Sequence, residues 1–230
     1  MRYWLPVIQG RYLNRFSFLE SAKQLHDLIG DYPQVAIGTV CKCQNVDYIE
    51  YCCKVARRFF QKSWIHAFGL TLIALPRVKH LINSFDSMAW TFPNIKGGHS
   101  CKNLKERRLY FHRYLRRLKE LAPDIRFYTF ADVESYPYWL CNRKNYKILF
   151  RRQFEHAIID CGVMDFHDPN IKDYPQSFLK EWKRKAETLY SALRGKVWIV
   201  IPDYPDDYNP NQFGDNVAKT LQNIRLFLEL

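Results

Sequence analysis

The chain has 230 residues with balanced hydrophobic and charged fractions, which excludes a disordered protein and a disulfide-stapled mini-protein. Lysine and arginine outnumber the acidic residues 35 to 23, so the formal net charge is +12 and a polyanion, either nucleic acid or an acidic membrane face, is the natural partner. The seven cysteines follow no framework spacing, residues 1–10 do not read as a signal peptide, and no apolar run is long enough to span a membrane. We therefore expect an intracellular, cytoplasmic protein without a membrane partner.

Short apolar runs alternate along the chain with longer amphipathic segments. The apolar runs predict eight strands, at Trp4–Gln9, Val35–Val40, Trp64–Gly69, Ile82–Trp90, Ile125–Phe130, Tyr146–Phe150, Ala157–Cys161 and Lys196–Pro202. The amphipathic segments predict helices at Phe16–Ile29, Val46–Gln61, Pro76–Leu81, Leu104–Leu121, Ser177–Leu193 and Asn216–Leu228. This alternation favours an α/β fold with a parallel sheet, and eight strands in this length fit a closed (β/α)8 TIM-type barrel. An open doubly wound sheet is the alternative, although no Gly-rich phosphate loop follows any of the strands.

Positive charge is concentrated in one part of the chain. The segment from Lys102 to Arg152 holds fourteen Lys or Arg residues and five acidic ones, so most of the net charge lies there. We expect one barrel domain, 1–230, in which residues 91–155 form a basic connecting region with an irregular insertion at Asp132–Asn145. The candidate phosphate-binding residues are Lys102, Lys105, Arg107, Arg108, Arg113, Arg116, Arg117, Arg151 and Arg152. A solvated helix face that binds nothing is the alternative.

Polar residues and glycines stand where the apolar strands end. They are Gln9, Gly10, Gly38, Gly69 with its aromatic neighbour Phe68, Asp86, Asp160 and Asp203. Because the active site of a parallel barrel lies at the carboxyl ends of its strands, we expect these positions to converge. Each acid alone also fits a helix cap or a solvated loop, but carboxylates beside apolar strand ends are costly unless they are paired or used.

Paired carboxylates have a chemical use at such a site. In glycosyl transfer one carboxylate captures the oxocarbenium-like carbon while a second group manages the proton of the leaving group. A carboxylate and a carboxamide also match the donors and acceptors along the edge of a purine. The residues alone thus predict an acidic cleft beside a basic flank, and a hydrolase that uses Asp86 and Asp160 on a small glycoside or nucleoside is one alternative.

Six segments resemble blocks of the tRNA-guanine transglycosylase superfamily. PVIQG, AIGTVC, HAFGL and SFDSMAW resemble successive blocks, and IIDCG and VIPDYP resemble two more, so the likeness covers roughly residues 4–90 and 156–230. The residues of these blocks are most similar to those of the branch that inserts 7-deazaguanines into DNA. In the family the blocks like IIDCG and VIPDYP precede the one like PVIQG, so the resemblance implies a circularly permuted barrel whose order joining Leu230 to Met1 would restore. A homodimer of two exchanged half-barrels is the alternative.

The resemblance implies roles for the acids. It gives Asp86 as the nucleophile that attacks C1′ of the nucleotide and forms a covalent glycosyl-enzyme intermediate. Asp160 takes the place of a second Asp that contacts the base and acts in acid/base work, and Asp203 matches the Asp that reads the purine edge.

The resemblance also implies contacts to the base. Gln9 with its neighbour Gly10, and the backbone at Gly38, match groups that hold the exocyclic oxygen. Phe68, next to Gly69, and Met164 fall where the family has residues that stack on the base, although both fit equally well as core residues.

Two departures from the family pattern concern zinc and the polynucleotide. The family carries a zinc site of three Cys and one His after the nucleophile, whereas His99, Cys101, His112 and Cys141 lack the tight Cys spacing of such a site. We therefore expect no zinc and no other cofactor. A Thr-Arg pair found after the nucleophile of bacterial tRNA enzymes is absent, and the chain has no room for the RNA-binding domain of archaeal ones. The expected activity is exchange of guanine in a polynucleotide, DNA before tRNA, for a 7-deazaguanine of the preQ0 type; a barrel that binds nucleic acid without exchange is the non-catalytic alternative.

Overall fold

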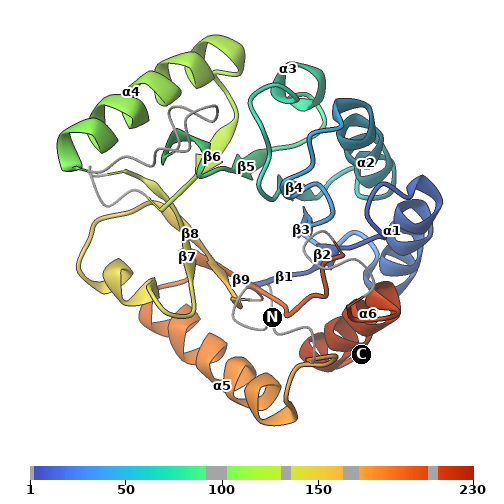
Figure 1. The fold of residues 1–230 in the computed structure, drawn as a ribbon. Coiled ribbons are helices and arrows are strands. Elements are labelled where there is room, and N and C mark those ends of the chain that lie inside the picture. Colours follow the sequence, from blue (N-terminus) through green and yellow to red (C-terminus); the bar gives the residue numbers. More distant parts are fainter. Residues whose placement is uncertain (1–2, 92–102, 131–135, 163–170, 207–211) are drawn as a thin grey trace.

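Short parallel strands form the ring at the centre of Figure 1, in a computed structural model that describes residues 3–91, 103–130, 136–162, 171–206 and 212–230. The strands are β1 (Trp4–Leu5), β2 (Val7–Ile8), β3 (Gln34–Ile37), β4 (Trp64–Ala67), β5 (Ser84–Asp86), β6 (Arg126–Tyr128), β7 (Tyr138–Asn142), β8 (His156–Asp160) and β9 (Val197–Val200). They pair in the orders β1-β9-β8-β7 and β2-β3-β4-β5-β6, and every pair is parallel.

The two sheets join into a closed ring at two places. β1 and β2 are one strand interrupted by Pro6, which has no N–H to donate, and its two parts pair with β9 and β3 respectively. On the other side, Thr129 and Trp139 form a parallel bridge, in which the Thr129 N–H donates to Tyr138 O (3.3 Å) and the Leu140 N–H to Thr129 O (3.2 Å). With β1 and β2 counted as one, the described residues supply eight barrel strands, which confirms the (β/α)8 prediction over the open sheet.

Helices surround the ring. They are α1 (Arg15–Ile29), α2 (Val46–Phe59), α3 (Leu75–Val78), α4 (Leu104–Leu121), α5 (Gln176–Ala192) and α6 (Asn216–Leu228), with short 3-10 turns η1 (Ala89–Thr91) and η2 (Tyr146–Phe150). Four of the helices begin at side chains that accept a backbone N–H of the first turn, namely Asn14, Asn45, Asn103 and Asp215. Within the described ranges, none of the helices combines the length and apolarity that crossing a bilayer demands.

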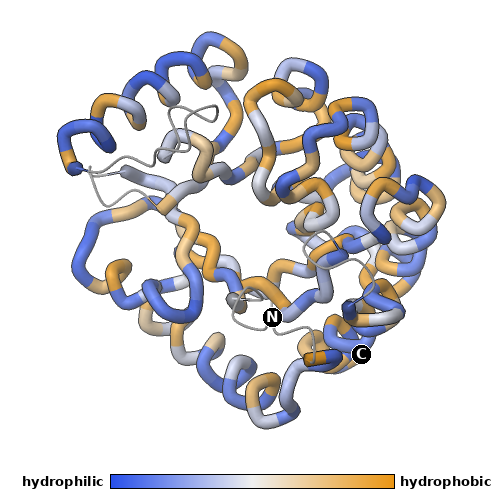
Figure 2. Tube along the Cα trace, in the orientation of Figure 1, coloured by the Kyte–Doolittle hydropathy of each residue, from blue (hydrophilic) through white to orange (hydrophobic). Residues whose placement is uncertain are grey.

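Apolar side chains fill two separate layers. One cluster lies inside the barrel and consists of Leu5, Val7, Ala36, Tyr128, Ile158 and Val200. A larger one lies between the strands and the helices, whose outer surfaces are mostly hydrophilic in Figure 2. Parallel strands covered on both faces need apolar residues on both, which is why they appear in the sequence as continuous apolar runs.

One strand differs from the prediction. Tyr146–Phe150 is the 3-10 turn η2, in which only Leu149 is buried, whereas the true strand is β7, at Tyr138–Asn142, inside the segment predicted to be an irregular insertion. Burial alternates along β7, and β7 pairs with β8 over five positions. This period-2 alternation identifies the strand, although Tyr146–Phe150 has the greater apolar content. Residues 91–155 thus supply two barrel strands and α4, not only a connection.

The beginning and the end of the barrel are neighbours. The indole of Trp4 in β1 meets the ring of Phe227 in α6 edge to face at 4.9 Å. Because β1 also pairs with β9, the ring runs without interruption past this point.

Candidate active site

The polar residues at the strand ends surround one mouth of the barrel. Asp86 is the last residue of β5 and Asp160 the last of β8, while Asp203 follows β9 after a short extended segment. Since all strands are parallel, their carboxyl ends share one face of the ring. The structure therefore brings acids from both halves of the chain to the same end. Met164 and Lys102 lie outside the described residues.

Gln9 and Asp203 are joined directly. The Gln9 amide Nε2 donates a short hydrogen bond to Asp203 Oδ2, and the Thr39 hydroxyl donates to Gln9 Oε1 at 3.1 Å. Thr39 Oγ1 in turn accepts from the Gly10 N–H at 2.6 Å. Gln9 is 1% exposed and Asp203 7%, so these contacts hold a carboxamide and a carboxylate in fixed positions at the rim of the barrel interior.

Two glycines near this pair leave no room for a side chain. A Cβ at Gly38 would lie 2.7 Å from Gln9 Cδ and 2.8 Å from Val7 Cγ1, so any side chain there would displace the Gln9 amide. A Cβ at Gly10 would lie 2.8 Å from the Cα of Phe18 in α1. Gly38 is therefore required by the site, and Gly10 by the packing of the strand against a helix.

Asp86 is held through one oxygen by two neighbours. Its Oδ1 accepts from the Gly69 backbone N–H at 2.9 Å and contacts His66 Nε2 at 3.2 Å. Gly69 has φ +60°, a conformation that glycine adopts without strain, and a Cβ there would approach Cys41 Sγ to 2.7 Å. No hydrogen bond from another described residue reaches Oδ2, which leaves that oxygen for a ligand.

Asp160 differs from an ordinary carboxylic acid. Burial, and secondarily the negative charge of Asp86, raise its pKa from 3.8 to about 6, although the backbone N–H groups of Gly162 and Cys161 oppose the rise. The effect of Asp86 on Asp160 means that the two carboxyl groups lie within electrostatic range of each other. Their different surroundings give one proton-exchanging group near neutral pH beside a carboxylate fixed by N–H donors.

Tyr174 links the third acid to Asp160. Its hydroxyl donates to the Asp203 backbone oxygen at 2.8 Å. Burial first, and then the charges of Cys161, Asp203 and Asp160, raise the Tyr174 pKa well above its ordinary value. Asp160 and Asp203 therefore lie near one buried phenol, which stays a neutral hydrogen-bond donor.

Phe68 lies beside the acids. Its ring is half-buried, packs against the cluster inside the barrel, and meets the His66 ring edge to face at 4.7 Å. A role in stacking on a base stays a prediction.

Three polar residues of this site were not among those predicted: Thr39, His66 and Tyr174. His66 lies inside the apolar strand β4, Thr39 follows β3 after one glycine, and Tyr174 belongs to a loop before α5. Only the position of Thr39 at a strand end carried a signal that could have identified it.

The basic residues of α4 begin beside the mouth. α4 follows β5 in the chain and returns toward the amino ends of the strands, so Lys105, Arg107 and Arg108 lie at its mouth end and Arg113, Arg116 and Arg117 lie progressively further along the barrel side. The Arg107 guanidinium lies 5.9 Å from the centroid of Trp90, whose Nε1 donates to Thr129 at 2.8 Å. Cations near the start of α4 thus stand close to the carboxyl end of β5.

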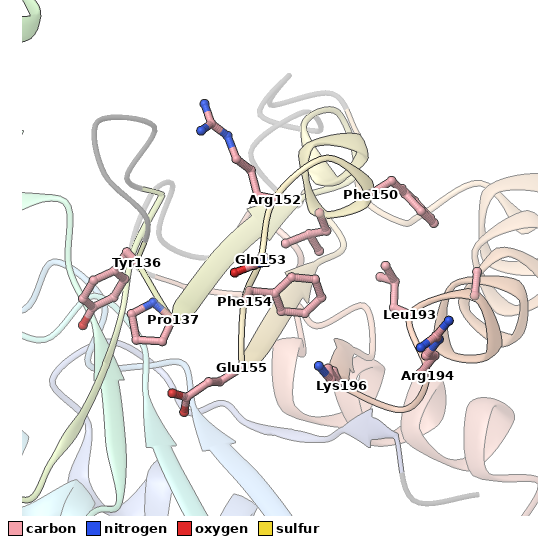
Figure 3. A pocket seen from close by; sticks show the side chains of 12 residues that line it. Tyr136, Pro137, Phe150, Arg152, Gln153, Phe154, Glu155, Leu193, Arg194 and Lys196 are labelled. Atoms are coloured by element: carbon pink, nitrogen blue, oxygen red, sulfur yellow. The ribbon is translucent and has the colours of Figure 1, made fainter.

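Arg152 lies at the end of the barrel opposite the acids. It borders a pocket of about 740 Å³ (Figure 3), together with Pro137, Glu155, Arg194 and Lys196. Pro137, Glu155 and Lys196 directly precede β7, β8 and β9, so this pocket opens at the amino ends of the strands. Arg152, and Arg151 beside it, are therefore separated from the acids by the length of the barrel.

Of the four residues compared with the family's zinc site, two are among the described residues. Cys141 is buried in β7, where burial raises its pKa to about 12, and His112 is exposed on α4. His99 and Cys101 lie outside the described residues. Among the residues with defined positions, no group of three or more His, Cys, Asp or Glu side chains is placed to hold a metal ion.

No protein-family model matches this sequence, and no curated protein matches it either. Among solved structures, the chain is similar to the phospho-2-dehydro-3-deoxyheptonate aldolase (DAHP synthase) of Thermotoga maritima, with a TM-score of 0.51, 12% identity, and 99% of this chain and 69% of that one covered. It is also similar to the DHPS of Yersinia pestis, with a TM-score of 0.46, 10% identity, and coverage of 97% and 95%. At such identity, the likeness to the aldolase supports the barrel fold and nothing finer.

Proposed function

We propose that this chain is an enzyme, a transglycosylase that exchanges guanine in a polynucleotide, preferably DNA, for a 7-deazaguanine. The observation that carries the proposal is the placement of Asp86, Asp160 and the Gln9–Asp203 pair at one mouth, with Asp86 acting electrostatically on Asp160. The resemblance of six sequence blocks supports the same assignment.

In the first half-reaction, Asp86 attacks C1′ of the target nucleotide. The C1′–N9 bond breaks, an ester forms between the Asp86 carboxylate and C1′, and guanine leaves with a proton. Asp160, whose pKa of about 6 leaves part of it protonated near neutral pH, donates that proton. The incoming 7-deazaguanine then loses a proton to Asp160 and attacks C1′, which frees Asp86.

Base selection falls to Gln9 and Asp203. A carboxylate accepts from a ring N–H and an exocyclic amine together, whereas a carboxamide N–H donates to an exocyclic oxygen, and guanine and 7-deazaguanine share this edge. A carboxamide Nε2 carries two N–H groups, so Gln9 has one donor besides the one bonded to Asp203. Adenine presents the opposite pattern and would leave both buried groups badly paired.

The nucleic acid would bind along the mouth side of α4. Lys105, Arg107 and Arg108 lie near the carboxyl end of β5, in reach of phosphates that flank a nucleotide at Asp86. A base in a duplex would have to leave the stack to enter the mouth. Arg151 and Arg152 are not part of this surface, because they lie at the opposite end of the barrel.

The circular permutation remains part of the proposal. Its geometric requirement is that the two ends of the barrel be adjacent, and the contact between Trp4 and Phe227 meets this requirement. A linker from α6 to β1 is thus compatible with an unchanged ring. A chain rejoined in this way and opened within the segment 91–102 should fold and retain exchange.

Incorporation of radiolabelled guanine and of labelled 7-deazaguanine into DNA and into tRNA tests the proposal. We expect incorporation into DNA with wild-type protein, a covalent protein–DNA adduct on denaturing gels, and no adduct with Asp86→Asn. The matched control is Asp124→Asn, a change of the same chemistry at an exposed residue near the amino ends of the strands. Incorporation into tRNA alone would move the substrate class, release of free guanine without exchange would indicate a hydrolase, and an adduct with Asp86→Asn would refute the nucleophile.

A further inference from the structure

A line of three hydrogen bonds leads from the barrel interior to Asp86. Trp64 Nε1 lies 2.8 Å from Ser84 Oγ, Ser84 Oγ lies 3.0 Å from His66 Nδ1, and His66 Nε2 lies 3.2 Å from Asp86 Oδ1. Trp64 and His66 are two positions apart on β4, as are Ser84 and Asp86 on the neighbouring strand β5. Side chains at such spacing point to the same face of a sheet, so all four reach into the barrel.

The proton positions along this line follow from the donor inventory. A carboxylate oxygen only accepts, so in the bond between His66 Nε2 and Asp86 Oδ1 the hydrogen is on Nε2. In a neutral imidazole Nδ1 then carries no hydrogen and accepts, so its donor is the Ser84 hydroxyl. An indole N–H only donates, so Ser84 Oγ accepts from Trp64 at the same time.

The surroundings of His66 keep its ring in place. His66 and Ser84 are both 0% exposed, and the imidazole packs edge to face against Phe68 at 4.7 Å and Tyr128 at 5.5 Å. The ring is therefore shielded from bulk solvent and packed against two aromatic rings. One tautomer and one orientation are fixed by the same contacts.

We propose that His66 is a positioning residue for Asp86, held as the Nε2–H tautomer by Ser84, whose hydroxyl Trp64 orients. Together with the Gly69 N–H, it occupies Oδ1 of Asp86 and leaves Oδ2 for the sugar carbon. The consequence for the reaction rate rests on the proposed function, whereas the tautomer does not.

The tautomer is measured without substrate. In protein labelled with 15N-histidine, the expected spectrum at pH 7 shows an unprotonated Nδ1 and a protonated Nε2 for His66, identified by the signal that H66Q removes. Ser84→Ala removes the only described partner of Nδ1, and we expect it to introduce the Nδ1–H form. A His66 signal of the Nδ1–H form or of imidazolium in the wild type would overturn the proposal.

The kinetic test distinguishes an effect on the position of Asp86 from an effect on DNA binding. We expect His66→Phe, which keeps the ring and loses the donor, to slow formation of the covalent adduct by about 10- to 100-fold at unchanged affinity for DNA. His66→Gln restores an N–H toward Asp86 and should recover most of the rate, whereas His80→Phe at an exposed position should change nothing. An adduct formed by His66→Phe at the wild-type rate, or no recovery with His66→Gln, would contradict the role.

The proposed function and the proposed tautomer of His66 are refuted by different results. If wild-type protein forms no adduct with any polynucleotide, the proposed function is wrong and the spectrum still decides the tautomer. If His66→Phe does not fold, Ser84→Ala carries the kinetic test, with a smaller loss of rate expected because its donor to Asp86 is retained in part of the molecules.

Discussion

Gln9 donates a side-chain hydrogen bond to Asp203 although the two residues are 194 positions apart in the chain. One follows the first strand of the barrel and the other the last, and these strands are neighbours because β1 pairs with β9. Closure of the ring therefore completes the base-recognition pair of the proposed site.

We predict that Gln9→Glu weakens base binding. The substitution replaces an N–H donor by a second carboxylate against Asp203, so like charges meet at a buried position and the group for an exocyclic oxygen is lost. The KM for the incoming 7-deazaguanine should rise by about 10- to 100-fold, in line with the cost of an unpaired buried group. Steady-state exchange with labelled base measures this, and an unchanged KM would separate Gln9 from base recognition.

Gly38→Ala and Gly10→Ala should affect different properties of the protein, base binding in the first and mainly stability in the second. The Cβ at Gly38 meets the flexible Gln9 side chain as well as Val7, whereas the Cβ at Gly10 meets the backbone of α1. We expect Gly38→Ala to fold with a loss of about 1–3 kcal/mol and to lose base affinity, and Gly10→Ala to lose more stability. Urea unfolding together with base binding checks this; a Gly38→Ala protein with normal affinity would show that Gln9 moves freely.

Stability should depend on pH through Asp160. Its pKa in the folded protein, about 6, exceeds the ordinary 3.8, so the ionised form destabilises the fold above pH 6 and the penalty disappears below about pH 4. Asp160→Asn should therefore stabilise the protein by about 1–3 kcal/mol at pH 8 and by nothing near pH 4. Chemical unfolding at both values measures the difference, and an equal effect at each pH would exclude Asp160 as its source.

The pH dependence of adduct formation should also reflect the protonation of Asp160. If Asp160 donates the proton to departing guanine, the single-turnover rate should be level below pH 6 and fall about tenfold per pH unit above it. Asp160→Asn should be slow and lack this limb of the profile. A wild-type profile without a fall above pH 6 would assign the proton to another group.

Charge reversal at two ends of the barrel tests the nucleic-acid surface. Lys105→Glu with Arg108→Glu, at the mouth end of α4, should weaken DNA binding and reduce the salt slope of the affinity by about one for each phosphate that is no longer neutralised. Arg151→Glu with Arg152→Glu makes the same change of charge at the far end and should leave the slope nearly unchanged. Equal reductions in both double variants would mean that net charge, not the mouth, attracts DNA.

The strand–helix alternation and the polar residues at strand ends could be predicted from the order of the amino acids. Both are local: parallel strands covered on two faces must be continuous apolar runs, and a polar residue at the end of such a run marks the edge of the sheet. Asp86, Asp160 and Gln9 were identifiable for this reason. Tyr138–Asn142 was not, because a short strand with three half-buried side chains resembles a loop until β8 lies beside it.

How these residues act on one another depends on the folded barrel. The bond of Gln9 to Asp203, the effect of Asp86 on Asp160 and the line from Trp64 to Asp86 each join different strands. His66 in the sequence is one polar residue within an apolar run, and nothing local specifies its partner. Its neighbours are set by the register of β4 against β5, and the end that holds Arg152 is set by the direction of the chain between β7 and β8. Register and direction arise from closing the whole ring, so the chemistry that they create exists only in the folded barrel.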